Sequence, residues 1–165
     1  MKRLSWKYVA GLVDGEGCIS FDRRHNSDPR YKHHVYVSPR LRVTLAANAK
    51  FLIEILHANF GGHISHRGKS SENSNWQDSY EWTVAGYERC CPLLRNIVNH
   101  LLIKREQIRL VLWMETHLKG NRSNQKVYDV IREESAAMKR DPHRLSETAQ
   151  TRIWDAIVGT AATAV

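Results

Sequence analysis

The stretch Val9-Ala10-Gly11-Leu12-Val13-Asp14-Gly15-Glu16-Gly17 decides how the rest of the chain is interpreted. It continues a segment, 5–13, whose apolar residues recur at helical spacing behind Ser5, a typical N-cap. Gly11 and Gly15 are four residues apart and therefore share one face of a helix. Because glycine in a helix costs up to about 1 kcal/mol relative to alanine, close packing against a second helix is the expected compensation.

The same stretch places two acids where a helix does not favour them. Asp14 and Glu16 fall at the predicted C-terminal end, where the neighbouring glycines favour a left-handed stop and the helix dipole is negative. A bound cation would reverse that penalty. If two copies of the helix pack together, two Glu16 carboxylates converge and repel each other unless a metal neutralises them. The stretch therefore predicts a divalent-metal site between two helices.

Charge and length narrow the class of protein. The chain has 165 residues, enough for one domain with a core. Its 25 Lys and Arg against 17 Asp and Glu give a net charge of +8, which favours DNA, RNA or an anionic membrane surface as partner. No segment is long and apolar enough for a signal peptide or membrane span. Cys18, Cys90 and Cys91 form neither a disulfide framework nor a zinc knuckle, so we expect a reducing, intracellular location.

Hydrophobic periodicity predicts an α+β fold. The first helix is followed by two strands, a helix, two more strands and then several helices. The predicted strands cover 18–24, 35–45, 63–67 and 77–84, and the later helices 51–60, 93–102, 105–118, 123–140 and 146–158. This order predicts an αββαββα core with a four-stranded antiparallel sheet covered by helices on one face. The expected divisions are a core at 1–118, a helical extension at 119–158 and a flexible tail at 159–165.

The uncovered face of the sheet is the expected surface for nucleic acid. Arginine bonds guanine bidentately, serine and threonine bond either kind of base edge, and a two-stranded ribbon fits the major groove. The 35–45 strand would run about 35 Å, close to one turn of DNA. A merely solvated polar face would show the same pattern. Pro39 interrupts this strand and suggests an edge or a bulge. The expected contact residues are Ser20, Asp22, Arg24, Tyr36, Ser38, Arg40, Arg42, Thr44, Ser65, Arg67, Ser79, Glu81 and Thr83.

The opening stretch resembles the LAGLIDADG signature of homing endonucleases, with Val9 in the first leucine position and Glu16 in the second acid position. The element order from about 5 to 118 also resembles the core of that family, whose sheet forms a DNA-binding saddle. The resemblance implies that Glu16 binds metal and that Gly15 offers its backbone carbonyl. Asp14 is expected to order the helix end. The implied cofactor is Mg²⁺, with Mn²⁺ as a substitute and Ca²⁺ as an ion that binds without supporting cleavage.

The chain contains one copy of this motif. Single-motif members of the family resemble homodimers, which implies an interface made by Tyr8, Gly11, Leu12 and Gly15. Dimer symmetry predicts double-stranded DNA with pseudo-palindromic halves, about twenty base pairs in total. The implied reaction is metal-dependent hydrolysis of both strands, leaving 3′ overhangs.

Two further positions follow from the resemblance. Lys104 falls where the family often places a basic residue near the scissile phosphate, and would polarise the attacking water or stabilise the charged transition state. The alternative is a surface lysine before a helix. The glutamine that the family often carries after its second strand is missing from 44–50. Asn48 either substitutes for it or, as we favour, caps the next helix.

Two other functions stay open at this point. Proteins of this fold also act as RNA-binding intron maturases or as catalytically silent DNA-binding regulators. The intact acid at Glu16 favours cleavage over both. The C-terminal helices would clamp the DNA backbone or support the dimer, although a solvated basic face explains their charge equally well. Their candidate phosphate contacts are Lys119, Arg122, Lys126, Lys139, Arg140 and Arg144.

Overall fold

The computed structural model describes residues 3–25, 30, 35–68, 78–119 and 123–161. Some predicted features lie outside these residues: most of the loops at 25–34 and 68–74, Arg122, and the end of the tail. The chain divides into two compact units. Unit 1 comprises Met1–Ile19 and Arg40–Leu102, and unit 2 comprises Ser20–Pro39 and Ile103–Val165.

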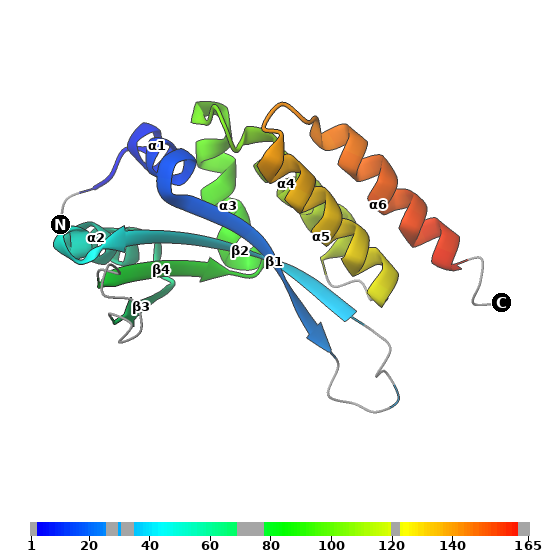
Figure 1. Cartoon of the computed structure of the whole chain (residues 1–165), viewed down its shortest axis with the longest axis horizontal. Helices are drawn as coiled ribbons and strands as arrows, with labels where there is room; N and C mark the ends of the chain where they lie inside the picture. Colours follow the sequence, from blue (N-terminus) through cyan, green and yellow to red (C-terminus); the bar gives the residue numbers. More distant parts are fainter. Residues whose placement is uncertain (1–2, 26–29, 31–34, 69–77, 120–122, 162–165) are drawn as a thin grey trace. The chain divides into compact units, whose positions relative to one another are not determined.

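The described residues form six α-helices and four strands (Figure 1). The sheet has the strand order β1-β2-β4-β3 and is antiparallel. Two short 3-10 turns, η2 (Ala47–Ala49) and η3 (Val98–His100), lie between larger elements. This arrangement confirms the predicted mixed fold and the αββαββα order. The elements are α1 (Trp6–Glu16), β1 (Gly17–His25), β2 (Val35–Ala46), α2 (Lys50–Phe60), β3 (His63–Arg67), β4 (Ser79–Ala85), α3 (Tyr87–Ile97), α4 (Arg105–Leu118), α5 (Gln125–Arg140) and α6 (Ser146–Ala161).

The core of unit 1 forms where α2 and α3 pack on β4. Trp82 and Val84 of β4 are fully buried there, because alternate residues of a strand point to the same face. The Trp82 indole Nε1 donates a hydrogen bond to the Gly61 carbonyl at 2.7 Å, which satisfies its polar atom. Gly62 follows with φ +91°, and a Cβ there would come within 2.5 Å of the Thr83 carbonyl. This turn therefore requires glycine.

The core of unit 2 is made by α6 packing on α4 and α5. Apolar side chains such as Ile108, Ile131 and Ile153 are fully buried between these helices. The Asn124 side chain caps α5 by accepting a hydrogen bond from the Val127 N–H at 3.0 Å. None of the helices among the described residues has the length and apolar character that a membrane span needs.

Two predicted helix ends are wrong. Helix α1 continues through Glu16, and Gly17 leaves it in an extended conformation at φ −77°, so no left-handed residue ends it. Helix α3 begins at Tyr87, well before the predicted start at residue 93, and contains Pro92 in its interior. Proline lacks the N–H of a helical hydrogen bond, at a cost of about 3 kcal/mol. Burial of Cys90, Cys91 and neighbouring side chains offsets this cost.

The edge-strand position suggested for Pro39 and the helix cap expected from Asn48 are also wrong, whereas a bulge at Pro39 stays a prediction. Strand β2 lies between β1 and β4, so Pro39 is not on an edge strand, and it is buried. The ladder between β2 and β4 begins at Arg40, one residue later, so the missing N–H of Pro39 removes no bond to β4. Asn48 lies exposed within η2, and α2 begins at Lys50 without a side-chain cap. Asn48 therefore does not cap that helix.

Candidate functional site

Helix α1 has an inner face that anchors it to unit 1. Val9, Ala10 and Val13 are fully buried, and the helix packs against α3 and η3. The Ser5 hydroxyl accepts a hydrogen bond from the Tyr8 N–H at 3.3 Å, which confirms the predicted N-cap. The inner face therefore fixes the helix by packing, independently of any second helix.

The opposite face of α1 is the predicted dimer face. Tyr8, Gly11, Leu12 and Gly15 follow at helical spacing and form one stripe. Tyr8 is 50% exposed, and a Cβ built on Gly11 or Gly15 would meet nothing within 4 Å. Packing against the described part of the chain thus gives no reason for glycine at these two positions. Gly17 differs, because its Cβ would lie 2.9 Å from the Val13 Cα where the chain turns into β1.

The two acids of α1 lie in different surroundings. Glu16 is the last residue of the helix and is exposed. Asp14 is half-buried, and its Oδ2 accepts a hydrogen bond from the Leu102 N–H at 2.7 Å. Asp14 thus joins the last turn of α1 to the chain that follows η3. This contact fits an ordering role for Asp14, and the role of Glu16 in binding metal stays a prediction.

The oxygen atoms at this helix end suit a hard divalent cation. Carboxylate and carbonyl oxygens are the ligands that Mg²⁺ and Ca²⁺ prefer, and the last carbonyls of a helix lack intrahelical partners. The Glu16 carboxylate and the Gly15 carbonyl therefore fit such an ion chemically. Within the part of the chain that is described, however, no group of three or more His, Cys, Asp or Glu side chains could hold a metal.

The β2–β4–β3 ladder arranges the predicted DNA contacts of unit 1 in rows. Arg42 pairs with Thr83, which pairs with His63, and Thr44 pairs with Glu81, which pairs with Ser65. Most of these side chains are half-buried, and Arg67 is exposed. Glu81 is only 8% exposed, so the expectation that it lies open on this face is wrong. The contacts placed in unit 1 are Arg40, Arg42, Thr44, Ser65, Arg67, Ser79, Glu81 and Thr83.

Two nitrogen atoms of the Arg42 guanidinium differ in their hydrogen bonding. The Arg42 Nη2 donates to the Cys18 Sγ of β1 at 3.7 Å. This contact depends on strand pairing and is therefore not visible in the sequence. The Arg42 Nε is buried and has no acceptor among the described residues. A buried donor without a partner is costly, so an acceptor outside the described residues would stabilise Arg42 here.

The remaining predicted contacts belong to unit 2. Arg24 of β1 is exposed, and the other members are half-buried. Because strands β1 and β2 alternate, these residues share the polar side of their strands. They are Ser20, Asp22 and Arg24 of β1, and Tyr36 and Ser38 of β2.

Lys104 also belongs to unit 2, where it is half-buried at the N-cap position of α4. Its carbonyl accepts the Ile108 N–H at 3.1 Å and so begins the helix. Glu16 belongs to unit 1. Joint action of Lys104 and Glu16 therefore remains a prediction.

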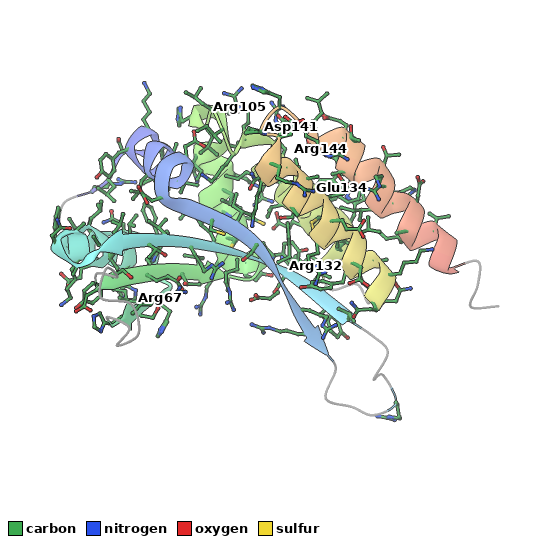
Figure 2. All side chains as sticks on the ribbon, viewed as in Figure 1. Arg67, Arg105, Arg132, Glu134, Asp141 and Arg144 are labelled. Atoms are coloured by element: carbon green, nitrogen blue, oxygen red, sulfur yellow. The ribbon has the colours of Figure 1, made fainter. Side chains whose placement is uncertain are left out.

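The basic residues of the C-terminal helices do not form one uniform set. Lys119, Lys126, Lys139 and Arg140 are exposed. Arg144 instead pairs with the fully buried Glu134 at 2.8 Å, and Figure 2 shows these two side chains close together. Arg144 is thus engaged in joining α5 to the segment before α6, which favours a structural role over a phosphate contact.

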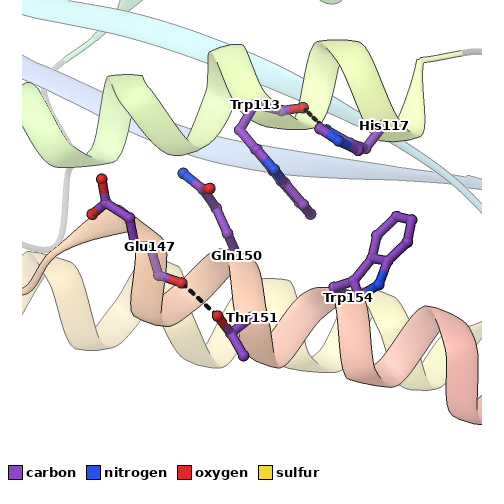
Figure 3. Close-up of a pocket in the computed structure, with 6 residues that line it drawn as sticks. All are labelled: Trp113, His117, Glu147, Gln150, Thr151 and Trp154. Carbon is purple, nitrogen blue, oxygen red and sulfur yellow. Dashed lines mark hydrogen bonds between the residues drawn. The ribbon is translucent and has the colours of Figure 1, made fainter.

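A hollow of about 430 Å³ lies between α4 and α6 (Figure 3). Trp113 and His117 of α4 stack at 4.3 Å, and the His117 ring meets Trp154 of α6 edge-on. The His117 Nδ1 lies 2.8 Å from the Trp113 carbonyl oxygen. Because a carbonyl oxygen can only accept a hydrogen bond, Nδ1 is the donor. None of the residues predicted to bind metal or DNA lines this hollow.

The sequence from residue 9 to 117 matches the family described as LAGLIDADG endonuclease. The chain therefore belongs to the LAGLIDADG endonuclease family, as the opening motif indicated. A search of curated proteins gave no match.

Solved structures share the fold. The homing endonuclease I-CvuI, in complex with its target in the presence of Ca²⁺, matches with a TM-score of 0.58 and 20% identity, over 88% of this chain and 90% of its own. The archaeal intron-encoded homing endonuclease I-Vdi141I, complexed with DNA, matches with a TM-score of 0.55 and 14% identity, over 90% and 93%. I-SmaMI, bound to an uncleaved DNA target with calcium ions, matches with a TM-score of 0.53 and 22% identity, over 94% of this chain and 50% of its own.

Proposed function

We propose that this chain is a site-specific homing endonuclease that acts as a homodimer on a long, pseudo-palindromic DNA target. The reaction is metal-dependent hydrolysis of both strands, with 3′ overhangs. The observation that carries the proposal is the division of α1 into two faces. Its inner face is buried in unit 1, while the stripe of Tyr8, Gly11, Leu12 and Gly15 faces outward and ends at the exposed Glu16.

The homodimer follows from the outward stripe. Glycine lowers helix stability, and no close contact with another described residue compensates for this at Gly11 or Gly15. A second copy of α1 crossing at these glycines would bring the two backbones close and bury both Tyr8 side chains.

The metal site would form where the two helix ends meet. Each copy would supply the Glu16 carboxylate and the Gly15 carbonyl, which are oxygen ligands of the kind that Mg²⁺ prefers. When bound, Mg²⁺ lowers the pKa of an attacking water and stabilises charge on the phosphate and the leaving oxygen. I-CvuI and I-SmaMI were solved in the presence of Ca²⁺, which supports the use of a divalent ion. Mn²⁺ would substitute, and Ca²⁺ would bind without cleavage.

The chain's own residues orient the substrate around that site. The polar side of the sheet reads base edges, with its arginines as the main guanine contacts. Asp14 fixes the chain at Leu102, two residues before Lys104. Lys104 holds its ammonium charge beside the scissile phosphate. The net charge of +8 steers the protein to DNA.

A randomised, pseudo-palindromic duplex library tests the proposal. The purified protein is incubated with the library in Mg²⁺ or in EDTA, alongside Glu16→Gln and a matched control, Glu54→Gln. Glu54 is an exposed acid on α2 that pairs with Lys50. We expect recurrent double-strand ends at one sequence, lost with EDTA and with Glu16→Gln and kept with Glu54→Gln. Cleavage that survives both treatments would refute the metal role of Glu16.

The main alternative is an RNA-binding intron maturase of the same fold. It predicts no cleavage of any duplex and tight binding of structured RNA. A silent DNA-binding regulator predicts sequence-specific duplex binding without cleavage. The same three proteins, assayed for binding to the duplex library and to structured RNA, separate these outcomes from the nuclease.

A further inference from the structure

The polar side of the unit 1 sheet contains a carboxylate that is almost withdrawn from solvent. The Glu81 side chain is 11% exposed in the middle of β4. Its direct neighbours across the ladder are Thr44 of β2 and Ser65 of β3. A charged carboxylate at such a position is costly unless it is paired and hydrogen-bonded. A negative charge on a surface that faces DNA phosphates adds to that cost.

Three side chains from three strands compensate Glu81. The Arg67 Nη2 of β3 donates to Glu81 Oε2 at 2.6 Å. The Thr44 and Thr83 hydroxyls donate to the two carboxylate oxygens at 3.4 and 3.3 Å, which is long for this kind of bond. Arg67 is therefore the principal partner, and the two threonines hold the carboxylate in place.

The pair leaves most of the Arg67 guanidinium available. A guanidinium carries five N–H donors, and the bond to Glu81 uses one nitrogen. The Arg67 side chain is 56% exposed, so it remains accessible to a further acceptor. An unpaired arginine on a surface samples many rotamers, whereas this one is fixed at one edge. A fixed guanidinium with free donors matches the two acceptors of guanine, O6 and N7.

We infer that Glu81 is a specificity-determining positioning residue that fixes Arg67 to read one guanine in each half-site of the DNA target. This inference rests on the proposed endonuclease function. Neutralised by Arg67, the Glu81 carboxylate does not repel the DNA. Without Glu81, Arg67 is free to contact phosphates, which carry no sequence information. Loss of the acid should therefore lower base discrimination while it strengthens binding to unrelated DNA.

The test measures base preference at every position of the target selected above. Each base pair is changed singly, and binding and cleavage are compared for the parent, Glu81→Gln, Arg67→Ala and the matched control Glu54→Gln. We expect Glu81→Gln and Arg67→Ala to lower discrimination about tenfold at the same base pair of each half-site. Glu81→Gln should also bind unrelated DNA more tightly than the parent, and Glu54→Gln should keep the parent's preferences.

Other outcomes distinguish a failure of this inference from a failure of the proposed function. If Glu81→Gln and Arg67→Ala change different base pairs, Glu81 contacts a base itself and the inference is wrong. If both leave every preference unchanged while the parent still cleaves, the inference fails and the endonuclease stands. A parent that neither binds nor cleaves DNA refutes the proposed function instead.

Arg67→Lys keeps the test decisive if Glu81→Gln fails to fold. A lysine ammonium can still pair with Glu81 but cannot bond guanine bidentately. We expect this variant to fold like the parent and to lose the guanine preference at the same base pair. A folded Arg67→Lys variant with full guanine preference would overturn the inference.

Discussion

The Asp14 carboxylate accepts the Leu102 backbone N–H at 2.7 Å, across 88 residues of sequence. This bond joins the last turn of the motif helix to the segment that leads to Lys104. The motif therefore contains one acid that holds the chain and one, Glu16, that faces outward. Substitution of Asp14 should therefore affect the order of the chain, and substitution of Glu16 should affect cleavage.

Asp14→Ala should remove the acceptor of the Leu102 N–H and lower the free energy of unfolding by about 1 kcal/mol. Cleavage should slow in single-turnover assays while DNA affinity changes little, because the lost contact orders the chain and touches no base. Asp14→Asn keeps a carbonyl acceptor and should restore most of both losses. Equal behaviour of the alanine variant and the parent would show that the bond has no ordering role.

Gly15→Ala should have opposite effects on folding and on association. The added Cβ meets no atom of the residues that the structure describes within 4 Å, and alanine favours a helix by up to about 1 kcal/mol, so the isolated chain should gain stability. Dimer dissociation should become at least about tenfold easier, because a methyl group separates the two helices. Sedimentation equilibrium measures association, and thermal unfolding of dilute protein measures the gain.

Gly17→Ala is the comparison for this experiment. Its Cβ would lie 2.9 Å from the Val13 Cα, so it should destabilise the chain whatever the oligomeric state. A Gly15→Ala variant that associates as tightly as the parent would argue against a dimer formed through this face.

Glu134→Ala should be among the most destabilising changes in unit 2. The carboxylate is fully buried and pairs with both Arg144 and Arg152. Removing one partner of a buried ion pair costs roughly 3 kcal/mol or more, and the partly exposed arginines place this case at the low end. Denaturant unfolding measures the change.

The neighbouring acid provides the control. Glu133 is 63% exposed and lies 3.4 Å from Arg152, so Glu133→Ala should cost about 0.5 kcal/mol or less. Similar losses for the two variants would mean that burial of Glu134 has no energetic consequence.

Trp82→Phe should weaken unit 1 by about 2 kcal/mol. Phenylalanine leaves a small cavity, and the Gly61 carbonyl loses the indole N–H that it accepts at 2.7 Å. Trp154 is 48% exposed on α6, and Trp154→Phe should change the free energy of unfolding by less than about 0.5 kcal/mol. Thermal unfolding of the two variants checks the difference.

Local sequence determined the type and order of the helices and strands, and it contains the motif of α1. Strand β3 and helix α4 have the predicted bounds, because glycines flank the strand at 62 and 68 and apolar residues recur at helical spacing along α4. Helix α3 was misplaced because Pro92 has the local preference of a helix boundary, and only burial of the surrounding side chains outweighs that preference. The order of elements and the acid at Glu16 were sufficient to indicate the family.

Tertiary structure decided which polar side chains act together. The alternation of β4 placed Glu81 with its polar neighbours, but its burial and its bond to Arg67 depend on strand register, which joins residues far apart in sequence. The contact of Asp14 with Leu102 depends in the same way on packing of α1 against η3. Periodicity fixes the face on which a side chain lies, because it is a property of neighbouring residues. Its partner across the sheet or core is fixed only when distant segments pack together.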